Sequence, residues 1–330
     1  MSAVAYEVDG EVAVLTVNYP PVNALSAAVR AGLGEALERA AADAAVEAIV
    51  VVGSGKTFIA GADITEFGTE NSKLLPSLKD LQHSLETSPK LTVAGIHGTA
   101  LGGGLELALT CHARVAVASA KVGLPEVNLG ILPGAGGTQR LPRLTGVEVG
   151  IDLITSGKHI PAAKALELGV VDAIVDDVRS GAIAFAREAL ASGRSFVPVI
   201  QRNEKVTGID PAVFAEARKT VGKKARGKIA PMVIIDCIEA ACTRPAAEAL
   251  AFEAERFQFL YASDQRGALM HYFFAERQAR KIPGIPAEVT PKTLESAAII
   301  GSGTMGGGIA MCFANAGIPV TLLDISQEAL

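Results

Sequence analysis

The 330-residue chain contains 49% hydrophobic and 20% charged residues, a composition typical of a compact, ordered protein that is long enough for two domains. Its net charge of −5 argues against a nucleic-acid-binding protein, because no basic run supplies a surface that neutralises phosphates. The N-terminus has no basic region followed by an apolar core, so we expect no secretory signal peptide.

In chain order, strand and helix patterns alternate through the first half of the sequence. Two short strands around a turn at Asp9-Gly10 are predicted first, and Ser26 then predicts the N-cap of a helix ending near Ala42. Buried strands are predicted within residues 46–55, 90–98 and 113–119, and residues 160–175 predict a helix, a turn at Gly169 and a strand. Since strands alternating with helices need crossover connections, this half predicts a parallel sheet.

Strand patterns cease near Arg179, and the following segment predicts helices with apolar faces over residues 211–222, 231–242 and 246–280. Residues 281–291, rich in proline and glycine, predict a linker. No charged residue lies between Glu295 and Asp324, yet the glycines there favour a buried strand–turn–helix–strand, and we expect no membrane span. The predicted domains are therefore a core (1–190), a helical extension with its linker (191–290) and a second α/β unit (291–330).

The four cysteines show no metal-binding spacing such as C-x-x-C. They are Cys111, Cys237, Cys242 and Cys312. We expect buried thiols in a reducing compartment rather than disulfides.

Glu106 follows the glycines Gly102–Gly104 and lies among leucines, where burying a carboxylate is costly. Glycines let the backbone approach a ligand closely, and a helix beginning there directs its free N–H groups and positive dipole end at that ligand. Residues 58–64 follow the previous strand and could supply a further N–H group. Two such groups from two loops predict an oxyanion hole for a polarised carbonyl oxygen.

A second acid, Glu126, lies in residues 121–141, where prolines and glycines predict a shaped loop. Two glutamates beside an oxyanion hole suit proton transfer next to a carbonyl. We expect partial burial to raise their pKa values, so that one of them holds a proton at neutral pH. Taken alone, Glu106 would be read sooner as a solvated helix residue than as a catalytic acid, and the three glycines could be a tight turn only.

Three segments of the sequence resemble the signature segments of the enoyl-CoA hydratase/isomerase, or crotonase, family. They are FIAGADI (58–64), HGTALGGGLELAL (97–109) and GLPEVNLGILPGAGGTQRL (123–141). Their order and the separation of 20 residues between the two glutamates also match the family. The resemblance implies an α/β fold: a crotonase-like β/α core with C-terminal helices. Its reaction needs neither a metal nor a cofactor.

The resemblance also implies roles in hydration of the 2,3 double bond of an enoyl-CoA. The N–H groups of Ala62 and Gly103 would hold the thioester oxygen. Glu126 would give a proton to C2, while Glu106 would orient and deprotonate the water. Isomerisation of a 3-enoyl to a 2-enoyl thioester needs a single base, which Glu126 could supply.

Contacts with CoA are implied for Asn23, Ala24, Ala60, Asp63 and Ile64. For two of these residues a structural alternative stays open: Asp63 could be a helix N-cap, and Asn23 could shape a turn. His97 and His112 flank the glycine segment, and we expect them to make local hydrogen bonds rather than to bind a metal.

Fold alone does not choose among the reactions of this family. A non-catalytic module that binds acyl-CoA or a partner, and another thioester reaction, therefore remain alternatives. Self-association also stays open, since single-function members of the family tend to be trimers or hexamers.

The C-terminal segment carries a different signature. Gly301, Gly303 and Gly306 form G-x-G-x-x-G between a predicted strand and a predicted helix, and Asp324 follows a second strand. This context predicts the first β-α-β of a Rossmann-type domain, with the pyrophosphate of NAD at the helix N-terminus and its ribose at Asp324.

A crotonase unit followed by this fingerprint resembles the multifunctional β-oxidation enzymes, in which the hydratase/isomerase precedes an NAD-dependent 3-hydroxyacyl-CoA dehydrogenase. Such a protein would act in the bacterial cytoplasm or in peroxisomes. The sequence ends at Leu330, after one strand–helix–strand, so we expect this chain to hydrate but not to oxidise.

Overall fold

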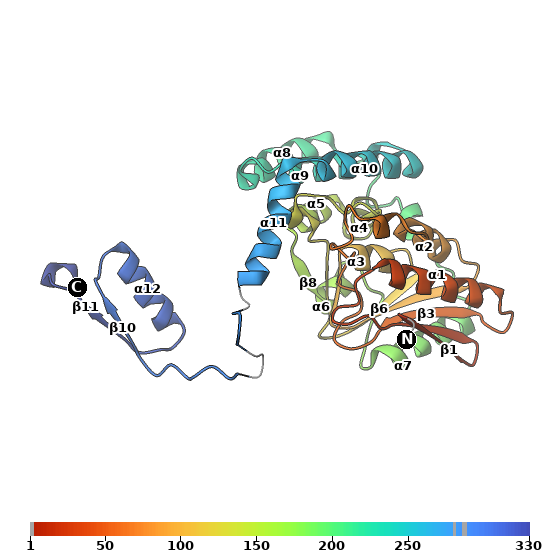
Figure 1. Cartoon of the computed structure of the whole chain (residues 1–330). Coiled ribbons are helices and arrows are strands. Elements are labelled where there is room, and N and C mark those ends of the chain that lie inside the picture. Colours follow the sequence, from red (N-terminus) through yellow and green to blue (C-terminus); the bar gives the residue numbers. More distant parts are fainter. Residues whose placement is uncertain (1–2, 280–281, 286–288) are drawn as a thin grey trace. The chain divides into compact units, whose positions relative to one another are not determined.

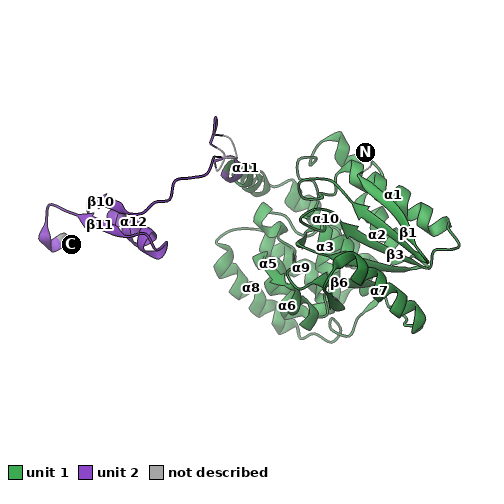
Figure 2. Ribbon diagram, turned by 90° about the horizontal axis from the view of Figure 1, so that it is seen from below, with its two compact units in different colours: residues 1–275 green, residues 276–330 purple. Residues whose placement is uncertain are grey.

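The computed structural model describes residues 3–279, 282–285 and 289–330 (Figure 1). The chain divides into two compact units, Met1–Ala275 and Glu276–Leu330 (Figure 2). Each unit has its own sheet, so each is described separately below.

A six-stranded sheet forms the centre of the larger unit, in the order β1-β2-β3-β4-β6-β9. β1 pairs antiparallel with β2 in a hairpin, and all the other neighbours are parallel, which confirms the predicted hairpin and parallel sheet. The strands are β1 (Val4–Asp9), β2 (Val12–Val17), β3 (Ala48–Gly53), β4 (Leu91–Ile96), β6 (Ala113–Val117) and β9 (Ala173–Val175).

Helices bury both faces of this sheet. Helix α1 (Ala27–Ala42) packs on β1 and β2, whereas α7 (Val178–Ala191) packs on β3, β4 and β6 from the opposite face (Figure 1). Successive strand residues alternate between two apolar clusters, as the two-residue period of a strand requires: Leu15 and Val51 belong to the larger one, Val14 and Val50 to the smaller. Ser26 caps α1 by accepting a hydrogen bond from the N–H group of Val29, as predicted.

A second, three-stranded sheet lies outside the sequence prediction. It consists of β5 (Thr99–Leu101), β7 (Lys121–Gly123) and β8 (His159–Pro161). Two short helices join this sheet to the central one, α3 (Gly103–Ala108) and α6 (Ala162–Glu167). The other short helices are α2 (Leu78–Glu86) and η1 (Glu70–Lys73) between β3 and β4, then α4 (Gly137–Thr145), α5 (Val147–Ser156) and η2 (Glu126–Leu129) between β7 and β8, and η3 (Val199–Gln201) after α7.

Four helices follow in the larger unit, the last of which runs past its boundary: α8 (Pro211–Ala225), α9 (Ala230–Thr243), α10 (Ala246–Tyr261) and α11 (Asp264–Ala279). The segment 246–280 is helical as predicted over its described residues, but it forms two helices, α10 and α11, because the helix breaks before Asp264. There the hydroxyl of Ser263 accepts a hydrogen bond from the N–H group of Arg266, which is an N-cap contact. Helix α9 packs on α4, α5 and α10.

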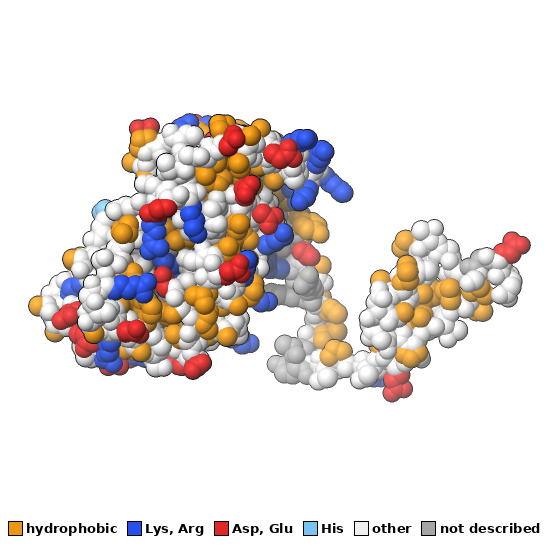
Figure 3. Space-filling model, turned by 180° about the vertical axis from the view of Figure 1, so that it is seen from behind, with side chains coloured by type: hydrophobic (Ala, Val, Ile, Leu, Met, Phe, Trp, Pro, Cys, Tyr) orange, Lys and Arg blue, Asp and Glu red, His pale blue; other side chains and the backbone are white. Residues whose placement is uncertain are grey.

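The smaller unit contains β10 (Ala297–Ile300), α12 (Thr304–Asn315), β11 (Val320–Leu323) and the 3-10 helix η4 (Gln327–Ala329), and the two strands pair in parallel as predicted. Ile300 and Met305 are exposed. Figure 3 shows hydrophobic side chains on the surface of this unit. The predicted linker falls partly outside the described residues; residues 282–285 and 289–296 form no helix or strand. Within the described ranges, no helix is long and apolar enough to cross a membrane.

All four cysteines are free thiols. Cys111 and Cys237 are buried as expected, and Cys242 is half-buried. The expectation is wrong for Cys312, which is exposed because the smaller unit covers no face of α12 completely.

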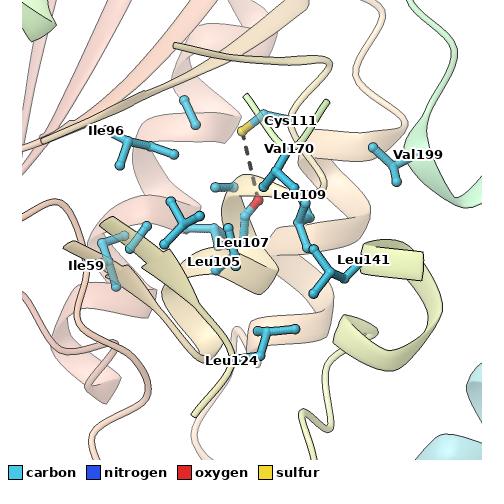
Figure 4. Packing of buried hydrophobic residues seen from close by; sticks show 14 of the residues in the cluster. Ile59, Ile96, Leu105, Leu107, Leu109, Cys111, Leu124, Leu141, Val170 and Val199 are labelled. Atoms are coloured by element: carbon cyan, nitrogen blue, oxygen red, sulfur yellow. Dashed lines mark hydrogen bonds between the residues drawn. The ribbon is translucent and has the colours of Figure 1, made fainter. Parts of the chain in front are cut away.

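Helix α3 enters the core of the larger unit as a single short turn surrounded by apolar side chains. Leu105 and Leu107 pack into the cluster drawn in Figure 4, and the thiol of Cys111 contacts the carbonyl oxygen of Leu107 there. A glycine is required at position 104, since a Cβ atom would lie 2.2 Å from the carbonyl oxygen of Ile59. This close approach fixes α3 against the loop that follows β3.

We therefore expect Gly104→Ala to lower the free energy of unfolding of the larger unit by about 2 kcal/mol or more, because the backbone of Ile59 must move. Gly222→Ala is the matched control: an added Cβ meets no atom within 4 Å in α8, so alanine should raise stability by about 0.5 kcal/mol. Urea titration followed by tyrosine fluorescence measures both, since all four tyrosines lie in the larger unit. Wild-type stability of Gly104→Ala would contradict this packing.

Candidate active site

Gly103 and Ala62, which belong to two separate loops, lie next to each other in the larger unit. Gly103 begins α3, so its N–H group has no acceptor within that helix. A Cβ atom on Gly103 would lie 3.3 Å from the backbone nitrogen of Ala62. The loop of Ala62 is held by a bridge to Leu25, whose N–H group donates to the carbonyl of Gly61 at 2.9 Å. The structure thus brings together the two residues of the predicted oxyanion hole, while their function stays a prediction.

Glu106 is buried in α3, and its carboxylate is bound by backbone N–H groups. Its Oε1 atom accepts hydrogen bonds from Ala135 and Gly137, both at 2.8 Å. Burial raises the pKa of Glu106, and these two hydrogen bonds oppose the rise because they stabilise the anion. The solvated alternative for Glu106 is therefore wrong.

The side chain of Gln82 forms hydrogen bonds both with the backbone of Glu106 and with the segment whose N–H groups bind the Glu106 carboxylate. The Nε2 group of Gln82, in α2, donates to the carbonyl oxygens of Glu106 at 3.1 Å and Ala135 at 2.7 Å. Arg140 adds a two-pronged ion pair with Glu86, at 2.9 and 2.7 Å. The sequence analysis missed Gln82, whose buried position on an amphipathic helix was the available signal.

Glu126 begins η2 and lies beside the glycine segment. A Cβ atom on Gly102 would lie 2.7 Å from its Oε1 atom, and the φ of 51° at Gly102 favours a glycine at this position. The buried Oε2 atom of Glu126 has no hydrogen-bond partner among the described residues. Burial, followed by the charge of Glu106, raises the pKa of Glu126 well above its ordinary range. The two glutamates therefore differ: Glu106 is the better anion, and Glu126 retains its proton to higher pH.

A third buried acid, Glu253, approaches from α10. It accepts hydrogen bonds from the N–H groups of Gly136 at 2.7 Å and Thr138 at 3.1 Å, and from the Thr138 hydroxyl. Burial and the charge of Glu106 raise its pKa to about 8, against the opposing effects of these hydrogen bonds and of Arg140. The sequence analysis missed Glu253, although it lies one helical turn from Ala249 on the buried face of α10.

The loops predicted to contact CoA run side by side. The N–H group of Ala60 donates to the carbonyl of Val22 at 3.1 Å, which places Ala24 close to the segment that holds Ile64. Asn23 has a positive φ of 54°, and its buried amide donates to carbonyl oxygens of the loop after β3, those of Ser54, Thr57 and Phe58. The side chain of Asn23 thus shapes the turn, and its backbone N–H group donates to the carbonyl oxygen of Tyr19 at 2.8 Å.

The helix N-cap alternative for Asp63 is wrong. Its Oδ1 atom accepts hydrogen bonds from the N–H and hydroxyl groups of Thr65, but a turn rather than a helix follows. Both histidines form the local hydrogen bonds expected of them: His97 with the carbonyl of Gly55, and His112 with the N–H group of Thr92. Within the described part of the chain, no group of three or more His, Cys, Asp or Glu residues could hold a metal ion.

In the smaller unit, the glycine-rich loop at residues 301–306 is bound by the carboxylate of Asp324. Asp324, after β11, accepts hydrogen bonds from the N–H group of Ser302 at 2.6 Å and from its hydroxyl at 2.7 Å. These contacts lower the pKa of Asp324 to about 2. Glycine is required at position 306, because a Cβ atom would lie 1.7 Å from the carbonyl oxygen of Gly301. Gly303 caps α12, so all four predicted residues lie around one loop.

Comparison with protein-family models supports both signatures. Residues 7–204 match the model described as enoyl-CoA hydratase/isomerase. Residues 296–330 match the model described as 3-hydroxyacyl-CoA dehydrogenase, NAD binding domain.

Two curated relatives cover nearly the whole chain. The peroxisomal bifunctional enzyme of Danio rerio is 42% identical over 330 residues, covering 97% of this chain and 45% of its own length. The fatty acid oxidation complex subunit alpha of Shewanella loihica is 38% identical over 340 residues, covering 98% of this chain and 48% of its own length. The chain thus spans less than half the length of these relatives.

Among solved structures, DspI of Pseudomonas aeruginosa has a similar fold. It is 29% identical with a TM-score of 0.55, and the match covers 79% of this chain and 96% of that one. The match is consistent with the α/β core described above.

The raised pKa of Glu253 makes folding stability depend on pH. Its folded pKa of about 8 exceeds the ordinary 4.5, so the folded state binds the extra proton between these values and stability falls as pH rises through this window. We expect Glu253→Gln to flatten the decline in unfolding free energy between pH 5.5 and pH 7.5 by up to about 1.4 kcal/mol per pH unit.

Urea titrations at several pH values, followed by tyrosine fluorescence, measure this slope. Glu248→Gln, an exposed glutamate on the same helix, is the control and should keep the wild-type slope. Equal slopes in Glu253→Gln and wild type would show that Glu253 is ionised in the folded protein throughout this range.

Proposed function

We propose that the chain, which belongs to the enoyl-CoA hydratase/isomerase family, adds water to 2-enoyl-CoA and so forms 3-hydroxyacyl-CoA in fatty-acid β-oxidation. This is a lyase reaction that needs no cofactor. One observation carries the proposal: Glu106, bound by two backbone N–H groups, and Glu126, whose buried Oε2 atom has no partner among the described residues, lie beside the adjacent residues Ala62 and Gly103 from two loops. The name of one relative quoted above, a fatty acid oxidation complex subunit, agrees with a place in fatty-acid oxidation.

The thioester carbonyl oxygen would accept hydrogen bonds from the N–H groups of Ala62 and Gly103. These donors stabilise the negative charge that develops on that oxygen when a nucleophile attacks C3. Glycine at 103 keeps the approach free of a side chain. CoA would lie along the adjoining loops, against the backbone of Asn23, Ala24 and residues 60–64.

The two glutamates would then divide the proton transfers. Glu106 uses its Oε1 atom for the N–H groups of Ala135 and Gly137, which leaves Oε2 to orient a water molecule and take its proton as oxygen bonds to C3. Glu126 holds a proton and gives it to C2. Water is thereby added across the double bond, and a proton transfer from Glu106 to Glu126 restores the starting state.

Isomerisation of 3-enoyl-CoA to 2-enoyl-CoA is a second activity that the site supports. This reaction moves a proton from C2 to C4 and needs one base beside the substrate. For this reaction Glu126 would act in its ionised form, taking the proton from C2 and returning it at C4; its buried Oε2 atom has no hydrogen-bond partner among the described residues. A module that only binds acyl-CoA would need neither the unequal protonation of two glutamates nor their burial, and we consider it the weaker reading.

The smaller unit fits the adenosine end of NAD. The pyrophosphate would lie over Gly301, Gly303 and Gly306, and Asp324 would bind the ribose hydroxyls, as in other dinucleotide sites. Bound NAD would supply the hydride acceptor of a 3-hydroxyacyl-CoA dehydrogenase. We propose dehydrogenase activity only for a longer chain that contains this unit. Relatives include peroxisomal and bacterial proteins, so we propose a peroxisomal or a bacterial cytoplasmic location, and self-association remains open.

We expect Glu106→Gln and Glu126→Gln each to slow hydration at least about a hundredfold, the usual size of a general acid–base contribution. Loss of the absorbance of a conjugated enoyl thioester measures the rate. Glu188→Gln, which removes an exposed glutamate from α7 on the far face of the sheet, is the control and should match wild type. Near-normal turnover by either purified, folded site variant would rule out the two-glutamate mechanism.

The same variants separate the two activities. If Glu126 alone moves the isomerase proton, Glu106→Gln should lose less isomerisation than hydration, while Glu126→Gln should lose both. A coupled assay starting from 3-enoyl-CoA measures isomerisation. Equal losses of the two activities in Glu106→Gln would contradict this division.

A further inference from the structure

Four consecutive backbone N–H groups at the start of α4 are shared by two carboxyl groups. Those of Ala135 and Gly137 donate to Glu106, and those of Gly136 and Thr138 donate to Glu253. The alternation means that the two acids bind this segment from two sides. The segment thus connects α3, at the proposed site, with α10, which is more than a hundred residues away in the sequence.

Helix α10 lies against this segment along one of its faces. Leu250, Glu253 and Phe257 are spaced by three and four residues and therefore share that face. A Cβ atom on Gly134 would lie 2.4 Å from the ring of Phe257, and one on Gly136 would lie 3.4 Å from Leu250. The apolar contacts fix the position of α10, and Glu253 adds the polar connection to the backbone.

We propose that Glu253 is a positioning residue for the reaction: it holds the segment 135–138 so that Glu106 keeps both of its N–H donors and its orientation toward the water. Glu253 need not touch the substrate to do this. The inference rests on the proposed hydratase function, since it assigns a purpose to Glu253 within that reaction.

The physical reason is the cost of buried N–H groups without acceptors. Without Glu253, Gly136 and Thr138 would each lose their acceptor in a site from which water is excluded. The segment 135–138 would move so that the N–H groups of Gly136 and Thr138 find other acceptors. The N–H groups of Ala135 and Gly137, which bind Glu106, would move with it because they alternate along the same segment. Shifts of about 1 Å in such supports lower catalytic rates by about a hundredfold in other enzymes.

The test compares Glu253→Ala and Glu253→Gln with wild type and with Glu248→Gln, an exposed change on the same helix. Hydrogen–deuterium exchange of a peptide covering residues 133–141 reports the segment without reference to activity. Steady-state hydration of 2-enoyl-CoA gives kcat and KM separately.

For Glu253→Ala we expect faster exchange in this peptide, with kcat lowered about tenfold or more and KM changed less than about threefold. Glu253→Gln should recover part of both properties, because its amide oxygen still accepts one of the N–H groups. Glu248→Gln should match wild type in both. Thr138→Val, which removes one hydroxyl contact with Glu253, should show the same changes to a smaller extent, and it replaces Glu253→Ala if that variant does not fold.

Two results would overturn the proposal: wild-type kcat in the folded Glu253→Ala protein, or a lowered kcat without faster exchange of residues 133–141. Failure of the proposed function is a different result, since it would appear as absence of hydration by the wild-type protein itself, whatever the exchange of the variants.

Discussion

The site depends on one interaction, the binding of the buried Glu106 carboxylate by the N–H groups of Ala135 and Gly137. A buried carboxylate is costly unless donors replace its lost hydration, and backbone N–H groups at the start of a helix are suited to this. The surrounding structure serves this contact. Gly104 lets α3 approach the backbone of Ile59 closely. Gln82 binds the carbonyl oxygens of both Glu106 and Ala135. Glu253 of α10 binds the N–H group of Gly136, which lies between the two donors of Glu106.

This contact also explains how two identical side chains differ in their affinity for a proton, a difference that the proposed mechanism uses. Glu126 is half-buried, whereas Glu106 is fully buried. The buried Oε2 atom of Glu126 lacks a donor, and the neighbouring charge of Glu106 adds to the penalty on its ionised form. The difference in pKa therefore arises from backbone geometry rather than from residue type. A base and an acid side by side, beside paired N–H groups, are what addition of water next to a thioester requires.

Local patterns in the sequence predicted much of this arrangement, and distant contacts account for the rest. The cap at Ser26 and the buried strands can be predicted because capping and periodicity act over a few residues. The proximity of Ala62 and Gly103 can also be predicted, because loops that follow parallel strands meet at one edge of the sheet. Glu253 was missed because its partners lie more than a hundred residues away. The three-residue strands β5, β7 and β8 are too short to show a period, and Asp63 resembles a helix cap while closing only a turn.

The central claim is that Glu126 carries a proton at neutral pH while Glu106 is ionised. The most direct measurement is the infrared difference spectrum between wild type and Glu126→Gln at pH 7, in which protonated and ionised carboxyl groups absorb in separate regions. The account predicts that the variant loses a band of a protonated carboxyl group. Loss of a carboxylate band instead would show that Glu126 is ionised, and would contradict the assignment of acid and base on which the mechanism rests.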